Sequence, residues 1–259
     1  MKKFSSLMPS VSCLLIAGCT ANGFYEGYSS TTPKEIESYN EKIFIGIPFS
    51  LSFEGSSVRI NDEWVATVAH NKVILIGREV YYHPRCDFAL IRDKADQKEN
   101  YPKVGYVYEN EGYNEIYHLG YPLFAPLSSH KGNYLGDVTN PTDNCYYSAT
   151  DGTVLGGMSG GGVYNKHGDV VGVTTGVMYK NIKWGKTANK REQMAPAVFM
   201  SFLAVEDFIH EVTGIEYYPN TVNLSNPLTE EEKADIQKQL KESKYRSSSK
   251  NIKQFKNTK

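Results

Sequence analysis

Short β-prone runs separated by turn residues are the feature that most constrains how this 259-residue chain can fold. Valine, isoleucine, threonine and aromatic residues cluster in runs such as Val73–Ile76, Val170–Thr175 and Ala197–Met200. Glycine, asparagine and proline stand between these runs, a pattern typical of many short strands joined by turns. The length suits one domain of about 170 residues with appended segments. The sequence therefore predicts an all-β barrel or sandwich.

The charge balance excludes one class of partner. Lysine and arginine together number 28 and aspartate and glutamate 29, which gives a formal net charge of −1. A chain with this balance has no electrostatic basis for binding nucleic acid. The sequence contains no indication of its oligomeric state.

A serine set among glycines is the candidate nucleophile. The segment 156–162 reads GGMSGGG, with Ser159 in its middle. Glycine adopts backbone angles that other residues avoid, so such a segment can bend sharply and expose the serine hydroxyl. The amides of Gly157 and Ser159 would then donate to the oxygen of an incoming carbonyl, as an oxyanion hole does. Taken alone, the segment also fits a flexible glycine linker.

Two segments upstream supply the partners that a serine nucleophile needs. A β-prone run over residues 60–70 ends at His70, and Asp87 opens a short apolar strand. A hydrolase with a catalytic triad requires a base for the hydroxyl proton and a carboxylate that orients the base. His70, Asp87 and Ser159 would fill these roles. Asp93 is the alternative acid, although it follows the apolar strand and is expected to face solvent.

Three motifs carry a resemblance to a known family. Residues 64–70 read WVATVAH, residues 87–91 read DFALI, and residues 157–161 read GMSGG. In this order they resemble the motifs of chymotrypsin-fold (trypsin-like) serine proteases, especially the compact bacterial branch related to HtrA and glutamyl endopeptidases. Gly120-Tyr121-Pro122 stands where bacterial members have a similar tripeptide. The likeness covers roughly residues 41–213.

The resemblance implies a fold and an activity. The fold is all-β, with two six-stranded antiparallel β-barrels over about 41–117 and 118–201 and a helix over 202–213, within a domain of residues 41–215. The activity is serine endopeptidase through an acyl-enzyme, with a protein or peptide substrate and without a metal or an organic cofactor. An inactive protease fold that binds peptides is the alternative. The other histidines are expected to be core or surface residues.

The gap between His70 and Asp87 is short for the family. Its 16 residues predict two short strands, Lys72–Ile76 and Glu79–His83, around a turn at Gly77-Arg78. A pair of strands is the minimum that would return Asp87 to His70. The resemblance also places the substrate pocket on Thr153, Thr174 and Thr175, which predicts a small polar pocket and small or medium apolar residues before the cleaved bond.

The amino terminus predicts export and lipidation. Two lysines precede a short apolar stretch, and Ile16-Ala17-Gly18-Cys19 resembles a bacterial lipobox. We expect residues 1–18 to be a lipoprotein signal peptide and Cys19 to carry the lipid, which attaches the protein to a membrane. Thr20 favours the outer membrane of the cell envelope, facing the periplasm. A plain signal peptide is the alternative, and residues 19–40 read as a tether.

Two cysteines remain in the predicted mature domain, because Cys13 leaves with the signal and Cys19 carries lipid. In an oxidising compartment, Cys86 and Cys145 are candidates for a disulfide near the triad. The sequence leaves open whether they form this bond or stay as buried thiols.

Residues 216–259 differ in character from the domain. Thr229 and Glu232 form a capping-box pattern ahead of a polar helix that is expected to reach about Lys244. The residues after it are basic and polar, and predict a disordered tail. The whole segment is too short for a PDZ domain.

Overall fold

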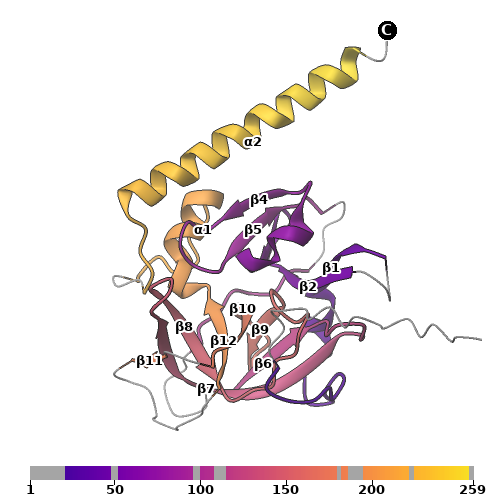
Figure 1. Ribbon diagram of the computed structural model, residues 1–259, viewed down its shortest axis with the longest axis vertical. Helices are drawn as coiled ribbons and strands as arrows, with labels where there is room; N and C mark the ends of the chain where they lie inside the picture. Colours follow the sequence, from indigo (N-terminus) through magenta and orange to yellow (C-terminus); the bar gives the residue numbers. More distant parts are fainter. Residues whose placement is uncertain are drawn as a thin grey trace, which may run out of the picture.

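Two antiparallel β-sheets and a helical C-terminal region make up the fold (Figure 1). The computed structural model describes residues 21–47, 52–95, 100–107, 115–179, 182–185, 195–221 and 225–256, without side chains after residue 243. The predicted signal peptide and Cys19 lie outside these residues. No helix in these ranges is both long and apolar enough to span a bilayer.

The first sheet contains five strands in the order β1-β2-β3-β5-β4. Their bounds are Asn40–Gly46 for β1, Ser52–Arg59 for β2, Trp64–Thr67 for β3, Glu79–Tyr82 for β4 and Ala89–Arg92 for β5. All neighbouring strands run antiparallel. This sheet is the first of the two predicted barrels, with five strands among the described residues where the prediction had six.

The second sheet closes on itself. Six strands follow the order β7-β6-β9-β10-β12-β8, and β8 pairs again with β7, while β11 extends β7 on its outer side. Their bounds are Glu115–Gly120 (β6), Ser128–Asn140 (β7), Cys145–Thr150 (β8), Gly162–Asn165 (β9), Val170–Val177 (β10), Lys183–Trp184 (β11) and Ala197–Ser201 (β12). The predicted chymotrypsin-like double barrel is therefore confirmed.

The predicted strand Lys72–Ile76 is wrong, because the segment from Ala69 to Leu75 forms a 3-10 helix, η2. Its side chains do not alternate between buried and exposed faces as a strand requires: Ile74 and Leu75 are both buried. The amide of Asn71 instead closes a tight turn on the carbonyl of Val68. This turn brings His70 out of the sheet. Of the two strands predicted between His70 and Asp87, only the second is present, as β4.

The predicted tether is also wrong for the residues that are described. Residues 21–39 lie on the second barrel and end in a 3-10 helix, η1 (Lys34–Tyr39). Ile36 of this helix is 1% exposed and belongs to the main core. The polar side chains that resembled a linker instead supply hydrogen bonds, for example from the hydroxyl of Thr32 to the hydroxyl of Ser129 (2.8 Å).

The C-terminal helices cover the first barrel (Figure 1). The helix predicted at 202–213 is a 3-10 turn, η3 (Leu203–Val205), followed by α1 (Glu206–Thr213), which ends at Gly214 in the left-handed conformation. The predicted capping box is confirmed, since Thr229 and Glu232 exchange backbone-to-side-chain hydrogen bonds of 2.8 and 3.2 Å. The helix α2 (Glu230–Lys256) extends beyond the predicted end near Lys244. Its sequence contains neither glycine nor proline, so nothing in it breaks a helix.

Three histidines are buried in the core, as expected for residues without a catalytic role. His118 is fully buried opposite His130 in the β6–β7 pair, and its Nδ1 bonds the hydroxyl of Thr174 at 2.8 Å. Burial lowers the pKa of His118 from 6.5 to about 3 and that of His83 to about 4, where the charge of Arg85 contributes further. Both side chains are therefore neutral in the folded protein at neutral pH.

We predict that these histidines make the fold sensitive to acid. Below about pH 6.5 these histidines bind protons in the unfolded chain, whereas in the folded chain they bind them only near pH 3 to 4. The free energy of unfolding therefore falls as the pH falls through this window. Each site contributes a slope of up to about 1.4 kcal/mol per pH unit. Urea unfolding between pH 7.5 and 4.5 should give a shallower slope for His118→Gln than for the wild type. Equal slopes would contradict the assignment.

Candidate active site

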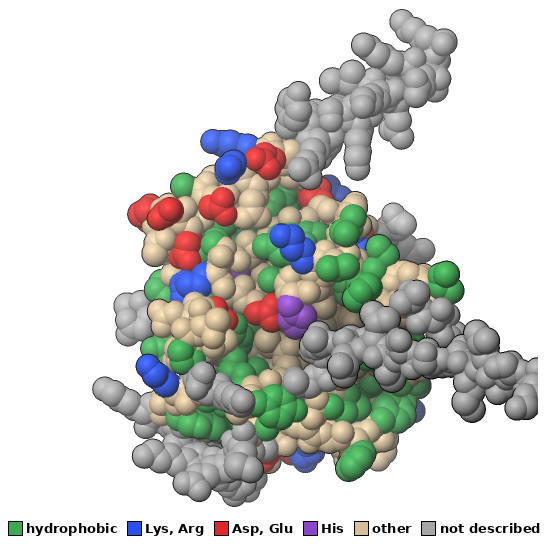
Figure 2. All heavy atoms as spheres, in the orientation of Figure 1, with side chains coloured by type: hydrophobic (Ala, Val, Ile, Leu, Met, Phe, Trp, Pro, Cys, Tyr) green, Lys and Arg blue, Asp and Glu red, His purple; other side chains and the backbone are tan. Residues whose placement is uncertain are grey.

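A cleft of about 510 Å³ lies between the two sheets and contains the predicted catalytic residues. His70, Asn71 and Asp87 reach it from segments next to the first sheet, and Gly157, Ser159 and Thr175 reach it from the side of the second sheet. Figure 2 shows a histidine and an acidic side chain side by side in the middle of this face, with hydrophobic side chains around them. Folding therefore brings together residues that are far apart in the chain.

His70 and Asp87 form a pair with two hydrogen bonds. The backbone amide of His70 donates to Asp87 Oδ1 at 2.9 Å, and its Nδ1 lies 2.7 Å from Asp87 Oδ2. A ring that donates from Nδ1 presents Nε2 as a proton acceptor. The alternative acid, Asp93, bonds Arg59 at 3.0 Å instead. Asp87 is thus the carboxylate that orients His70.

The residues on both sides of Asp87 are fixed in the core. Cys86 forms a disulfide with Cys145 at the start of β8, with 5.7 Å between the two Cα atoms, so the bond that the sequence left open joins the two barrels. Phe88 is fully buried and packs edge-on against Phe202 and Phe208, with ring centroids 6.0 and 5.8 Å away. The backbone that carries Asp87 therefore has little freedom to move.

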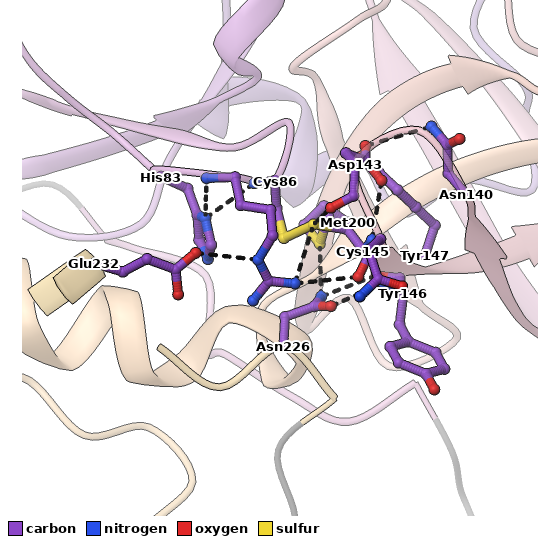
Figure 3. The surroundings of a disulfide bond; sticks show 12 residues. His83, Cys86, Asn140, Asp143, Cys145, Tyr146, Tyr147, Met200, Asn226 and Glu232 are labelled. Carbon is purple, nitrogen blue, oxygen red and sulfur yellow. Dashed lines mark hydrogen bonds and ion pairs between the residues drawn. A yellow bond between two sulfur atoms is a disulfide. The ribbon is translucent and has the colours of Figure 1, made fainter. Parts of the chain in front are cut away.

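Figure 3 shows how the disulfide is surrounded by polar contacts from three parts of the chain. The ring Nδ1 of His83 accepts hydrogen bonds from the amides of Arg85 and Cys86. The guanidinium of Arg85 donates to Glu232 of α2 at 3.1 Å and to the carbonyl of Asn144 at 3.1 Å. Arg85 thereby ties the loop before Asp87 to the C-terminal helix and to the second barrel.

The backbone of Ser159 is bonded to the first sheet. Its carbonyl accepts hydrogen bonds from the amide of Ser56 (2.9 Å) and from Nδ2 of Asn71 (3.0 Å), the residue next to His70. Gly160 has φ +91°, and a Cβ there would lie 2.1 Å from the carbonyl oxygen of Ser56, so only glycine fits. The hydroxyl of Ser159 donates to the carbonyl of Thr175 at 3.1 Å rather than to the ring of His70.

Neighbouring hydrogen bonds orient the two amides that were predicted as an oxyanion hole. The carbonyl of Gly156 accepts from an amide in the loop after β6 at 2.8 Å, and that of Met158 accepts from Gly161 at 2.9 Å. In a trans peptide the C=O and the following N–H point in opposite directions, so the N–H groups of Gly157 and Ser159 point away from these contacts. Within the described residues, neither amide donates to a protein acceptor.

A comparison with family models supports the resemblance noted in the sequence. Residues 53–173, which carry His70, Asp87 and Ser159, match the family model of the trypsin-like peptidase domain. This part of the chain is similar to a trypsin-like peptidase domain. No curated protein matches the chain in a sequence search.

Solved structures that resemble this chain include proteases. The HtrA-type protease AlgW with a tripeptide matches with a TM-score of 0.51 and 16% identity over 70% of this chain and 63% of its own. An AlgW variant with a tripeptide matches with a TM-score of 0.50 and 16% identity over 68% and 61%. The MamO protease domain from Magnetospirillum magneticum matches with a TM-score of 0.48 and 13% identity, over 66% of this chain and 96% of its own. The chain thus spans about three fifths of the AlgW chains, and the likeness shows the fold.

The pocket beside Ser159 differs from the prediction. Of the three predicted threonines only Thr175 lines the cleft, because neighbours in a strand point to opposite faces and Thr174 is buried against His118. Thr153 packs under Gly23 of the N-terminal segment. The cleft walls of the peptidase domain are apolar here, formed by Val154, Leu155, Val177, Met178 and Val198. The prediction of a small polar pocket is therefore wrong.

Three residues that position the site were missed in the sequence. Ser56 bonds Ser159 through its amide and the carbonyl of Gly157 through its hydroxyl (2.8 Å), Asn71 bonds Ser159, and Asn22 bonds the loop that lines the cleft. No motif marks them, since their role depends on contacts between distant segments. Among the described residues, no three His, Cys, Asp or Glu side chains form a metal site.

We predict that the disulfide stabilises the peptidase domain and the position of Asp87. The bond closes a loop with a sequence separation of 59, so replacing both cysteines with alanine should lower the free energy of unfolding by about 4 kcal/mol. Urea unfolding measures this loss. Dithiothreitol should lower the urea midpoint of the wild type but leave that of Cys86→Ala/Cys145→Ala unchanged. A wild-type midpoint that does not respond to reductant would contradict the prediction.

Proposed function

We propose that the trypsin-like domain is an active serine endopeptidase with Ser159 as nucleophile, His70 as general base and Asp87 as the orienting carboxylate. The observation that carries this proposal is the cleft itself, which contains the bonded His70–Asp87 pair, Ser159 and two amides that donate to no acceptor among the described residues. Each component of acyl transfer is then present within one water-accessible space.

The proposed reaction follows the chemistry of these groups. His70 Nε2 takes the hydroxyl proton while Ser159 Oγ attacks the peptide carbonyl, and the amides of Gly157 and Ser159 stabilise the resulting oxyanion. The protonated ring, held by Asp87, gives its proton to the leaving amine as the C–N bond breaks. Water, deprotonated by His70, then hydrolyses the acyl-enzyme and restores the serine.

The hydroxyl of Ser159 must turn before it attacks. Its hydrogen bond to the carbonyl of Thr175 has to be exchanged for one to His70, which a rotation about χ1 achieves. The same hydrogen bond supports a second candidate function, a peptide-binding module on an inactive protease fold. In that case the cleft would bind a chain without forming an acyl-enzyme.

The apolar walls of the cleft support a substrate class. Val154, Leu155 and Met178 would surround the side chain that precedes the cleaved bond. Burying such a side chain against apolar walls favours binding by about 25 cal/mol per Å² of apolar surface. We therefore expect cleavage after valine, leucine or methionine in proteins or peptides.

A fluorophosphonate probe distinguishes the two functions. It should label the wild type and not Ser159→Ala, and the wild type alone should cleave a peptide library, after apolar residues. Asp87→Asn should lower kcat by about 10⁴-fold because the ring loses its orientation, whereas the matched control Asp93→Asn should stay within about twofold. Circular dichroism checks that all variants are folded. A folded wild type that neither labels nor cleaves supports the binding module.

We further propose that the peptidase is a lipoprotein of the bacterial envelope, at the outer membrane facing the periplasm. The lipobox-like sequence ending at Cys19 supports this location. Ala21, two residues later, accepts a hydrogen bond from Tyr179 at 2.9 Å beside the cleft. A lipid on Cys19 would therefore hold the enzyme by a point close to its substrate site.

Lipidation has a direct test in a bacterial host. The wild type should incorporate an alkyne-labelled palmitate and partition into the detergent phase of Triton X-114, because acyl chains bury in apolar phases. Cys19→Ser should lose both properties, while the control Cys13→Ser should retain them. Label on the Cys19→Ser variant, or none on the wild type, would rule out the assignment.

A further inference from the structure

The loop that carries Ser159 lies outside both sheets. β8 ends at Thr150 and β9 begins at Gly162, so residues 151–161, here the cleft loop, belong to no strand. Among the described residues, this loop forms backbone-to-backbone hydrogen bonds with strands only at its two ends, at Asp151 and at Ser159–Gly161. Buried backbone groups in such a loop need hydrogen-bond partners from elsewhere. Val154 of this loop is 1% exposed, and both of its backbone polar groups are bonded to one residue, Asn22.

Asn22 contacts the cleft loop through three hydrogen bonds. Its amide donates to the carbonyl of Val154 (3.3 Å), and its side-chain oxygen accepts from the amide of Val154 (2.7 Å). Its side-chain nitrogen donates to the carbonyl of Gly152 (3.1 Å). In the described part of the chain, Val154 has no other backbone partner. Asn22 thus does for this loop what a neighbouring strand does inside a sheet.

The residues next to Asn22 contact both walls of the pocket. Ala21 bonds Tyr179, which follows the wall residue Met178, and Gly23 lies against Thr153. A Cβ on Gly23 would lie 2.5 Å from Thr153 Cγ2, so the approach requires glycine. Residues 21–23 therefore join the two walls behind the pocket.

The segment that carries Asn22 is attached to the domain further along the chain, between residues 27 and 36. It can therefore restrict the movement of the cleft loop instead of moving with it. The carbonyl of Gly27 and the amide of Ser29 both bond Ser129 of β7, at 3.1 and 2.8 Å. Ile36 is buried in the main core. A fixed segment thus extends from the core of the domain to the back of the cleft.

A displacement of Val154 would also displace Ser159, because only a few contacts separate the two residues. Val154 packs against the fully buried Met158, the residue before Ser159. The carbonyl of Leu155, next to Val154, accepts from the amide of Met158 at 3.1 Å. The position of Val154 therefore constrains the backbone on which the hydroxyl and the two amides depend.

We propose that Asn22 is a positioning residue for catalysis, and that residues 21–23 hold the cleft loop in the conformation that presents Ser159 and the oxyanion amides. The kinetic part of this inference rests on the proposed endopeptidase function. The structural part, that Asn22 orders the cleft loop, stands apart from any activity.

The test compares two asparagines in the full-length protein. Asn22→Ala should speed amide hydrogen exchange in residues 152–159 by roughly 10-fold, because the loop loses its backbone partners, and should lower kcat roughly 10-fold through misplaced reacting groups. The control Asn220→Ala, an exposed residue after α1, should match the wild type in both measurements. Unchanged exchange in residues 152–159 of Asn22→Ala would overturn the proposal.

A second pair of variants covers the case in which Asn22→Ala is unstable. Gly23→Ala should speed exchange in the same residues, since the new methyl group collides with Thr153. Thr153→Ala in that background should restore slow exchange, because the remaining Cβ lies 3.1 Å from the new one. Equal rates of amide hydrogen exchange in residues 152–159 of the single and double variants would contradict a role for the contact between Gly23 and Thr153.

The two proposals fail in different ways. A wild type without labelling or turnover refutes the endopeptidase, while exchange in residues 152–159 still decides whether Asn22 orders the loop. An active wild type whose kcat is unchanged by Asn22→Ala, despite faster exchange, overturns the positioning role and leaves the endopeptidase intact.

Discussion

The hydrogen bonds between the carbonyl of Ser159 and the first sheet are the contact on which the assembled cleft depends. The amide of Ser56 in β2 and the side chain of Asn71 in η2 both donate to this oxygen, and η2 also carries His70. Gly160 allows the approach because a side chain there would collide with Ser56. Two barrels that fold as separate sheets thereby align a serine from one with a histidine from the other.

The same principle holds for the other residues of the cleft, which are placed by the backbone around them. Asp87 lies between a disulfide-bonded Cys86 and a buried Phe88. The cleft loop is held at Val154 by Asn22. Reacting groups have to be held close to their productive geometry, and here the packing and hydrogen bonds of the adjacent backbone contribute to that.

Local patterns in the sequence predicted the features that depend on neighbouring residues. The capping box at Thr229 and Glu232 follows from such a pattern. The double barrel and the grouping of His70, Asp87 and Ser159 were implied by the family resemblance that three short motifs carry. The predicted strand at 72–76, the predicted tether, and the assignment of Thr153 and Thr174 to the pocket were wrong. A local 3-10 turn, closed by the bond from Asn71 to Val68, replaced the strand. Tertiary contacts decided the other two outcomes: the packing of Ile36 and the contact of Thr174 with His118.

The sequence by itself determined which chemical groups the chain possesses and that its glycines permit a sharp bend around Ser159. It also restricted the chain to short antiparallel strands, because β-branched runs and turn residues act over a few neighbours. Only the tertiary structure decided that an N-terminal segment lies behind the pocket, that Cys86 joins Cys145, and that the cleft walls are apolar. These features arise from contacts between residues far apart in the chain, and such contacts leave no local pattern.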